Sequence, residues 1–359
     1  MTVETRIDAV DEAHIDAHAE ACITEAGGIL RRGGLVVFPT ETVYGLGADA
    51  FNDDAAERIY AAKGRPSDNP LIVHIADVEA LDRLCVWQNE TTHTNAMKLA
   101  DAFWPGPLTM VLKKNSDLPA RTTGGLDTVA VRLPANEIAR RLIRAAGGYV
   151  AAPSANRSGR PSPTAARFCI EDMNGRADMI IDGGDCVIGL ESTIVDLTGK
   201  EPVILRPGNI TEREIRSVLG LRGTGNADET HATDGEPPRA PGMKYRHYAP
   251  KGEFIVFRGT PERVADRITR AAADARAGGK TTGVIASDET KETYDADIVR
   301  SYGSGTDHEA VAHNIYRILR EMDEAGAEII FGEMPGAGKL SAAIENRLFK
   351  ACAGHVEDV

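Results

Sequence analysis

The sequence has no long apolar run and few cysteines. A membrane-spanning helix needs about 18 apolar residues in a row, and no such run occurs in the 359 residues. The first twelve residues are charged and lack the apolar core of a signal peptide. The five cysteines are scattered without zinc-knuckle spacing, which is typical of reduced thiols. We therefore expect a cytoplasmic protein with no membrane association.

Excess positive charge is also missing. The chain has 41 Lys and Arg against 54 Asp and Glu, so its formal net charge is −13. A strongly acidic protein is repelled by the phosphate backbone of nucleic acids unless a local basic patch overrides that field. We therefore do not expect a general RNA or DNA binder.

The length indicates two domains, because 359 residues exceed one ordinary hydrophobic core. Residues 1–219 form the first domain in this prediction, and residues 251–359 form the second. Residues 220–250 form the linker, which is rich in Gly, Thr, Asp and Pro as far as Pro241 and has no apolar period. Its last part, Lys244 to Pro250, carries two tyrosines, two cations and a histidine, which is typical of a segment that docks on the protein or on a ligand.

Apolar runs and helical periods alternate along both domains, which predicts an α/β fold. In the first domain we expect strands at 35–38, 71–75, 108–112, 129–133, 149–152, 178–184, 192–197 and 203–208. The helices expected there are 15–30, 54–62, 78–84, 95–103, 137–145 and 212–219. In the second domain we expect strands at 254–257, 283–286, 298–299 and 328–331, and helices at 262–277, 309–325 and 341–351.

The loop after the helix at 54–62 contains two cations two residues apart, Lys63 and Arg65, with Gly64 between them. In an extended or turn backbone, residues i and i+2 can point the same way, so the two charges can converge. Lys offers a point charge and Arg a two-pronged donor, which together suit a polyanionic ligand. An ordinary charged surface turn is the alternative.

Other polar groups follow the ends of predicted strands, where α/β sheets commonly bind ligands. Residues 39–47 combine two threonines, a tyrosine and two glycines, and residues 153–164 are rich in hydroxyl and amide groups. Arg132 lies inside a strand, so its charge must face solvent, a partner or a ligand. Arg206 ends another strand.

Two further patterns are weaker. His14 and His18 have metal-ligand spacing on a helix, but no third ligand accompanies them, so an exposed helix face is favoured. Residues 332–339 resemble a phosphate-binding loop, but the spacing is one residue too long and no Ser or Thr follows Lys339.

The sequence shows no order of Ser, His and Asp typical of a nucleophilic triad and no nucleophile elbow. Cations and hydroxyl or amide donors at strand ends instead favour charge stabilisation and positioning. Phosphoryl and nucleotidyl transfer depend on these effects, because charge spreads over phosphate oxygens in the transition state.

Several stretches resemble the L-threonylcarbamoyl-AMP synthase family, which has the YrdC-type fold. They are 39–47 (PTETVYGLG), 63–66 (KGRP) and 152–156 (APSAN), with a Lys-x-Arg and a distant Ser-x-Asn in the family's order. Residues 129–132, 192–193 and 206–208 match further family stretches. The tail resembles the longer members, in which a linker like residues 244–250 crosses the active site.

The resemblance implies a YrdC-like twisted mixed sheet with helices, followed by a small Rossmann-like α/β domain. It also implies a nucleotidyltransferase that makes threonylcarbamoyl-AMP and pyrophosphate from L-threonine, bicarbonate and ATP, with Mg²⁺ accompanying ATP and no metal ligands from protein side chains. The product would pass to a complex that modifies tRNA next to the anticodon, and direct tRNA binding would be weak or absent.

By the same resemblance, Lys63 and Arg65 are the expected catalytic residues. The residues expected to face L-threonine are Thr42, His74, Arg132, Ala152 and Ser192. The residues expected to hold ATP are Arg65, Asn69, Thr128, Ser154, Asn156, Ser162, Arg206 and Tyr248, although the sequence alone does not choose between Tyr245 and Tyr248.

Three other functions compete with this hypothesis. An RNA-binding module would need an aromatic stacking platform, and none is evident in this acidic chain. A carbamoyl-transfer domain of hydrogenase maturation has the same fold but carries zinc-finger cysteines and an acylphosphatase-like part. A regulatory sensor would bind ATP without turnover.

Overall fold

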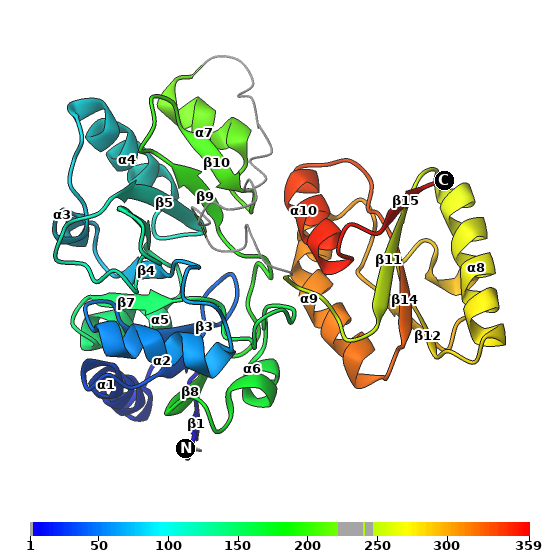
Figure 1. Ribbon diagram of the computed structural model, residues 1–359, viewed down its shortest axis with the longest axis horizontal. Coiled ribbons are helices and arrows are strands. Elements are labelled where there is room, and N and C mark those ends of the chain that lie inside the picture. Colours follow the sequence, from blue (N-terminus) through cyan, green and yellow to red (C-terminus); the bar gives the residue numbers. More distant parts are fainter. Residues whose placement is uncertain (1–2, 222–239, 241–246) are drawn as a thin grey trace. The chain divides into compact units, whose positions relative to one another are not determined.

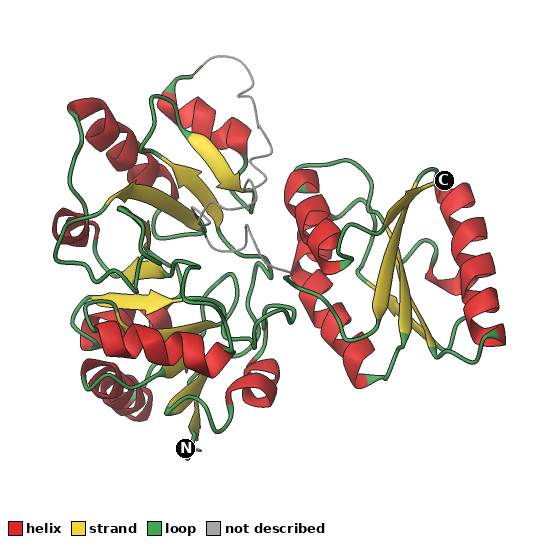
Figure 2. Cartoon of the chain, in the orientation of Figure 1, coloured by secondary structure: helices red, strands yellow, loops and turns green. Residues whose placement is uncertain are grey.

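The computed structural model describes residues 3–221, 240 and 247–359. Contacts divide the chain into two compact units, each built on its own sheet. Residues 159–162 and 188–190 belong to the second unit together with the C-terminal part of the chain, whereas the rest of the N-terminal part forms the first unit. Figure 2 shows helices and strands in both units, as the expected α/β class requires.

The first unit contains a ten-stranded mixed sheet in the order β1-β8-β2-β3-β7-β4-β6-β5-β9-β10. Its strands are β1 (Arg6–Ala9), β2 (Val36–Phe38), β3 (Gly45–Asp49), β4 (Ile72–Ile75), β5 (Leu108–Lys113), β6 (Thr128–Arg132), β7 (Tyr149–Ala152), β8 (Met179–Asp182), β9 (Thr193–Asp196) and β10 (Val203–Arg206). Both parallel and antiparallel pairs occur, which confirms the mixed sheet expected from the resemblance.

Helices cover this sheet in two groups. The helices are α1 (Ala17–Arg31), α2 (Asp53–Lys63), α3 (Leu81–Leu84), α4 (Glu90–Phe103), α5 (Glu137–Ala145), α6 (Ala166–Met173) and α7 (Glu212–Leu219), with a 3₁₀ turn, η1 (Val78–Ala80), before α3. Helices α1 and α5 bury their apolar residues in one core with β2, β7 and β8, whereas α2, α4, α6 and α7 belong to a second core. Both groups are visible in Figure 1.

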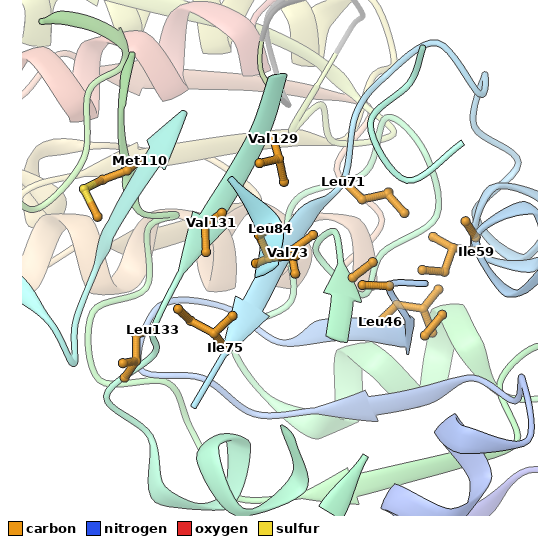
Figure 3. Close-up of a cluster of buried hydrophobic side chains, with 14 of the residues drawn as sticks. Leu46, Ile59, Leu71, Val73, Ile75, Leu84, Met110, Val129, Val131 and Leu133 are labelled. Carbon is orange, nitrogen blue, oxygen red and sulfur yellow. The ribbon is translucent and has the colours of Figure 1, made fainter. Parts of the chain in front are cut away.

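The alternation of side chains along the central strands separates the apolar face from the polar one. Val73 and Ile75 of β4, like Val129 and Val131 of β6, point into the second core, which is drawn in Figure 3. Successive residues of a strand point to opposite faces. His74 lies between Val73 and Ile75, so it points to the opposite face of the sheet.

That opposite face gathers several of the predicted site residues. In the register of the sheet, His74 pairs with Arg132 and Ile72 pairs with Ala152, and paired residues share a face. At the other end, Arg206 pairs with Ile194 after a register shift that realigns β10. We call this surface, over β4, β6, β5, β9 and β10, the polar face, although it also carries a small apolar cluster that includes Ile72 and Ile194.

Three strands and one α-helix were not expected from the sequence: β1, β3, α6 and, in the second unit, β15 (Val356–Asp358). Strand β3 (Gly45–Asp49) occupies part of the stretch expected to be a loop, and it pairs antiparallel with β2 and β7. The sequence did not indicate β3 as a strand because it contains two glycines, and glycine is rare in strands. The glycines are required by close packing: a Cβ on Gly47 would lie 2.9 Å from both the Phe38 ring and Val150.

The predicted linker falls mostly outside the described residues, as does Tyr245. Ala240 and residues 247–250 are described, and Ala240 is buried against β4, β5, β6, β9 and β10. Among the described residues, no helix has both the length and the apolar character that crossing a bilayer requires.

The second unit contains a five-stranded sheet, parallel at every pairing, in the order β13-β12-β14-β11-β15. Its strands are β11 (Glu253–Arg258), β12 (Thr282–Ala286), β13 (Ile298–Ser301), β14 (Ile329–Glu333) and β15 (Val356–Asp358). Its helices are α8 (Pro261–Ala277), η2 (Lys291–Thr293), α9 (His308–Glu324) and α10 (Ser341–Ala351). Helix α8 covers one face and α9 and α10 the other, which is the Rossmann-like arrangement that was expected (Figure 1).

The packing around Gly47 gives a stability prediction. Gly47→Ala should lower the free energy of unfolding by about 1–3 kcal/mol, because the added methyl group overpacks the Phe38 ring and Val150. Urea unfolding measures this change. Gly199→Ala is the control, since its nearest neighbour lies 3.5 Å away. Equal midpoints for the two variants would contradict the packing described.

Candidate active site

A buried lysine joins two loops of the first unit. Lys63 is 3% exposed, and its Nζ donates to the backbone oxygens of Ser154 at 2.5 Å and Asn156 at 2.6 Å. The Ser154 hydroxyl donates to Asn156 Oδ1 at 2.5 Å, and the Ser158 amide donates to the Lys63 carbonyl at 2.9 Å. The structure therefore brings the Lys-x-Arg and Ser-x-Asn motifs into direct contact.

Local sequence explains why Lys63 lies at this junction. Helix α2 begins after Asn52, whose side chain accepts from the Ala55 amide, and it ends at Gly64 in the left-handed region with φ of 64°. Glycine adopts that conformation without strain. The helix therefore stops directly after Lys63, and the loop that carries Arg65 begins there.

Arg65 and Asn69 lie in the same loop. Arg65 Nη2 donates to the carbonyl oxygens of Asn69 at 3.0 Å and Pro70 at 3.2 Å. Asn69 is fully buried, and within the described residues neither atom of its side-chain amide has a hydrogen-bond partner. A buried amide without a partner is unfavourable by about 1–3 kcal/mol, so it is suited to meet a ligand.

A second cluster surrounds Arg132 on the polar face. Arg132 Nη1 donates to Thr42 Oγ1 at 2.8 Å, and its Nε donates to the Gly106 carbonyl at 3.3 Å. Its Nη2 lies 2.7 Å from Glu41 Oε1 in an ion pair with little exposed surface on either side chain. The charge inside this strand thus faces a partner.

His74 lies beside Arg132 as a neutral base. Burial, together with the neighbouring Arg132 charge, lowers the pKa of His74 to about 3. Its Nδ1 lies 3.1 Å from the Ile72 carbonyl, and its ring packs edge-on against Phe38. At neutral pH this imidazole can therefore offer a ligand a neutral hydrogen-bonding group.

A third cluster links three strands at the far end of the polar face. Ser192 Oγ lies 2.7 Å from Thr109 Oγ1, and Arg206 donates to the Ser192 carbonyl at 3.0 Å and to its hydroxyl at 3.1 Å. All three side chains are buried. The cluster presents a cation and two hydroxyl groups.

Short connections run between the three clusters. Gly45 forms an isolated bridge with Ser154, and Gly45 follows Thr42 by three residues, which joins the first cluster to the second. Gly106 accepts from Arg132, and the next carbonyl, that of Pro107, accepts from the Thr193 amide at 3.0 Å, which joins the second to the third. The clusters therefore form one continuous part of the first unit.

The comparisons with known proteins cover nearly the whole chain. A family model described as "Telomere recombination" matches residues 28–208, and one described as "Threonylcarbamoyl-AMP synthase, C-terminal domain" matches residues 210–353. Threonylcarbamoyl-AMP synthase of Pyrococcus abyssi is 48% identical over 326 residues, 91% of this chain and 92% of that protein. The protein of that name from Bacillus subtilis is 44% identical over 352 residues, 98% and 97% of the two chains.

This chain belongs to the threonylcarbamoyl-AMP synthase family. The structure of P. abyssi Sua5 complexed with L-threonine matches it with a TM-score of 0.90 and 46% identity, over 99% of this chain and 100% of that one. The match extends over both units of this family member, which confirms the family and the fold predicted from the sequence.

Two predicted ATP residues lie in the second unit. Ser162 belongs to the segment 159–162, which is held there because Arg320 of α9 donates to the Pro161 carbonyl at 3.0 and 2.6 Å. Tyr248 is buried, has a positive φ of 66° and packs on Tyr316 with ring centroids 5.0 Å apart. Their contact with ATP remains a prediction.

Two more predicted residues lie at strand ends. Thr128 begins β6 and is partly buried, and Ala152 ends β7 and is buried.

Among the described residues, no group of three or more His, Cys, Asp or Glu could hold a metal ion. All five cysteines are buried and free of disulfides.

Sequence reasoning assigned no role to Glu41 and Thr109, although both touch predicted site residues. Glu41 lies in the motif at 39–47, and a carboxylate beside two threonines in a strand-end turn was the available signal. Thr109 gave no signal of a functional role, because threonine is common in strands. Both contacts join segments more than eighty residues apart, which local patterns do not encode.

The buried Arg132–Glu41 pair gives a second prediction. Arg132→Met should lower the free energy of unfolding by about 3–5 kcal/mol, because it leaves the Glu41 carboxylate buried without its cation. The double variant Arg132→Met/Glu41→Gln should regain part of that loss. Urea unfolding measures both.

Arg144→Met is the matched control, since its pair with Asp77 is exposed and should cost less than about 1 kcal/mol. If Arg132→Met unfolds at the same urea concentration as Arg144→Met, the pair does not contribute as described.

The low pKa of His74 predicts a specific pH dependence. Between its ordinary pKa of 6.5 and its folded value of about 3, the unfolded chain binds more protons at this residue. Stability therefore falls as pH falls in that window, by up to about 1.4 kcal/mol per pH unit from this residue. His74→Gln should lose less stability than the parent between pH 6.5 and 4.5, as measured by chemical unfolding. Parallel pH profiles would rule out the depressed pKa.

Proposed function

We propose that this protein makes threonylcarbamoyl-AMP from L-threonine, bicarbonate and ATP and releases pyrophosphate. The observation that carries the proposal is the match, over nearly the whole chain, to the Sua5 structure complexed with L-threonine. The reaction transfers an adenylyl group, which makes the enzyme a nucleotidyltransferase. Its fixed cations and buried hydroxyl groups suit that chemistry, because charge stabilisation is the main demand.

In the first step, the amine of threonine forms an N-carboxy anion, either by attack on bicarbonate with loss of water or by attack on CO2 with loss of a proton from the amine. Arg132 would orient the amino acid through its carboxylate. Each terminal nitrogen of a guanidinium carries two N–H groups, so one on each remains after Thr42 and Glu41 are paired. Neutral His74, on the same face, would supply a further polar contact.

In the second step, the N-carboxy anion attacks the α-phosphorus of ATP in line with the leaving pyrophosphate. Arg65 and Arg206 would offset the charge that develops on the phosphate oxygens. Lys63 would act mainly by fixing the two loops, since its ammonium group donates to two backbone carbonyls. Asn69, with its buried amide, would contact the nucleotide.

Magnesium would enter with ATP and supply Lewis-acid charge at the phosphates. Mg²⁺ keeps several waters and is often held by substrate phosphates rather than by a protein cage.

The product would pass to a tRNA threonylcarbamoyl-transfer complex in the cytoplasm. The adenylate carries the activated group, so this enzyme does not need to hold tRNA itself. The net charge of −13 supports weak direct tRNA binding, and a gel shift at moderate salt tests it.

Pyrophosphate release tests the proposed function. The enzyme should release pyrophosphate only when ATP, L-threonine and bicarbonate are all present, and omission of any one should reduce release to background. A regulatory sensor would bind ATP without releasing pyrophosphate under any of these conditions.

Arg65→Ala should lower the rate of pyrophosphate release by about a hundredfold or more, because it removes a charge-assisted contact to phosphate. Its unfolding midpoint should stay close to that of the parent, since Arg65 is partly exposed. Arg144→Ala, an arginine paired with Asp77 outside the site, is the control and should retain full activity. Full activity of Arg65→Ala would remove Arg65 from the mechanism.

A further inference from the structure

The loops that follow strands β13 and β14 enclose a hollow that lies wholly within the second unit. It is lined by residues 305–309 and 336–339 and has a volume of about 480 Å³. Strands β13 and β14 are parallel neighbours of β12, so both loops leave the same edge of the sheet. The carboxyl edge of a parallel sheet is where α/β folds bind ligands.

A buried histidine without a partner lines this hollow. His308, the first residue of α9, is 7% exposed. Within the described residues, neither of its ring nitrogens has a hydrogen-bond partner. Burial of a polar group without a partner costs about 1–3 kcal/mol, so a purely structural role would favour an apolar side chain here.

Gly338 leaves the space that the imidazole occupies. A Cβ on Gly338 would lie 2.5 Å from His308 Nε2 and 2.6 Å from Cδ2 of the same ring. Any other residue at this position would displace the ring. The loop at 336–339, whose sequence resembles a phosphate-binding loop only weakly, is thus fitted to the histidine.

The surroundings combine several sources of positive potential. Helix α9 is 17 residues long and begins at His308, and the N-terminus of a helix carries partial positive charge. Helix α10 begins at Ser341, two residues after the exposed Lys339, and no side chain caps it among the described residues. Such termini are ready-made anion sites.

Two carboxylates lie at the same hollow and limit its affinity for anions. Asp307 caps α9, because its side chain accepts from the amides of Glu309 at 3.2 Å and Ala310 at 3.0 Å. Glu309 is exposed in the first turn of the helix. No metal-binding group of three or more His, Cys, Asp or Glu is present in the described part of the chain, which argues against a cation.

We infer that this hollow binds a phosphate group, either as a free ion or as part of a small nucleotide. In the bound state the His308 ring turns toward the hollow, and it donates to the phosphate oxygens together with the Lys339 ammonium group and the amides of Gly336 and Ala337, since the Gly338 amide is already paired with the Ser341 hydroxyl. The inference goes beyond the proposed function, because the site uses no residue of the first sheet.

The test follows the ring signals of His308 by NMR in the full-length protein. Inorganic phosphate, pyrophosphate and AMP are titrated separately, and the His308 signals are assigned by their loss in His308→Leu. At least one ligand should shift these signals saturably. A response to phosphate or pyrophosphate alone identifies the free ion as the ligand, and a response to AMP identifies a nucleotide.

Calorimetry on variants adds the expected magnitudes. His308→Leu should weaken binding about tenfold or more, because it removes a hydrogen bond to a charged group. It should unfold at the same or a higher urea concentration than the parent, since it removes buried polar atoms that lack partners. Glu309→Gln should tighten binding about two- to fivefold by removing a repulsive charge.

His355→Gln is the matched control, because His355 is an exposed histidine of the same unit. Gly338→Ala provides a second disruption if His308→Leu fails to fold, and it should also abolish the NMR response. Arg65→Ala should retain this binding although it loses pyrophosphate release, which separates the two sites. No saturable shift with any of the three ligands, or unchanged affinity in His308→Leu, would overturn the inference.

Discussion

The hydrogen bonds of the Lys63 ammonium group to the carbonyls of Ser154 and Asn156 are the interaction on which the rest of the site depends. A buried cation is tolerated only when its three N–H groups are satisfied, and here two backbone oxygens and, at 3.4 Å, Asn156 Oδ1 accept from them. The same contacts fix the loop after α2 against the loop after β7. The loop that carries Arg65 and Asn69 is thereby held in place before any ligand binds.

In the sheet of the same unit, successive residues of each strand point to opposite faces. Val73, Ile75, Val129 and Val131 fill one core, whereas His74, which lies between Val73 and Ile75, and Arg132, which follows Val131, point to the other face. Because β4 and β6 are in register, His74 and Arg132 lie side by side on regular strands and not on loops. Regular strands position catalytic groups more precisely than loops do. The candidate site thus combines a cluster that is fixed on regular strands with a cluster that is built on loops.

The sequence predicted local features well and non-local ones poorly. Helices α5 and α7 were predicted with their observed bounds, because their apolar spacing and their glycine or polar ends are local signals. Strand β3 was missed because of its glycines, and the need for glycine there becomes clear only from the packing of the Phe38 ring in the fold. Likewise, Arg132 was known to need a partner, but Glu41 lies about ninety residues away in the chain, and only the fold joins them.

Native-state hydrogen exchange in Lys63→Met tests the central role of this lysine most directly. Two amides of the loop after β7 report on this junction: the Ser158 amide, which donates to the Lys63 carbonyl, and the Ala155 amide, which donates to the Tyr44 carbonyl. Both should exchange about tenfold or more faster than in the parent protein, because the loops lose the ammonium group that holds them. Amides of β4 and β6 should keep their protection. Unchanged exchange at Ser158 and Ala155 would show that Lys63 does not organise the site.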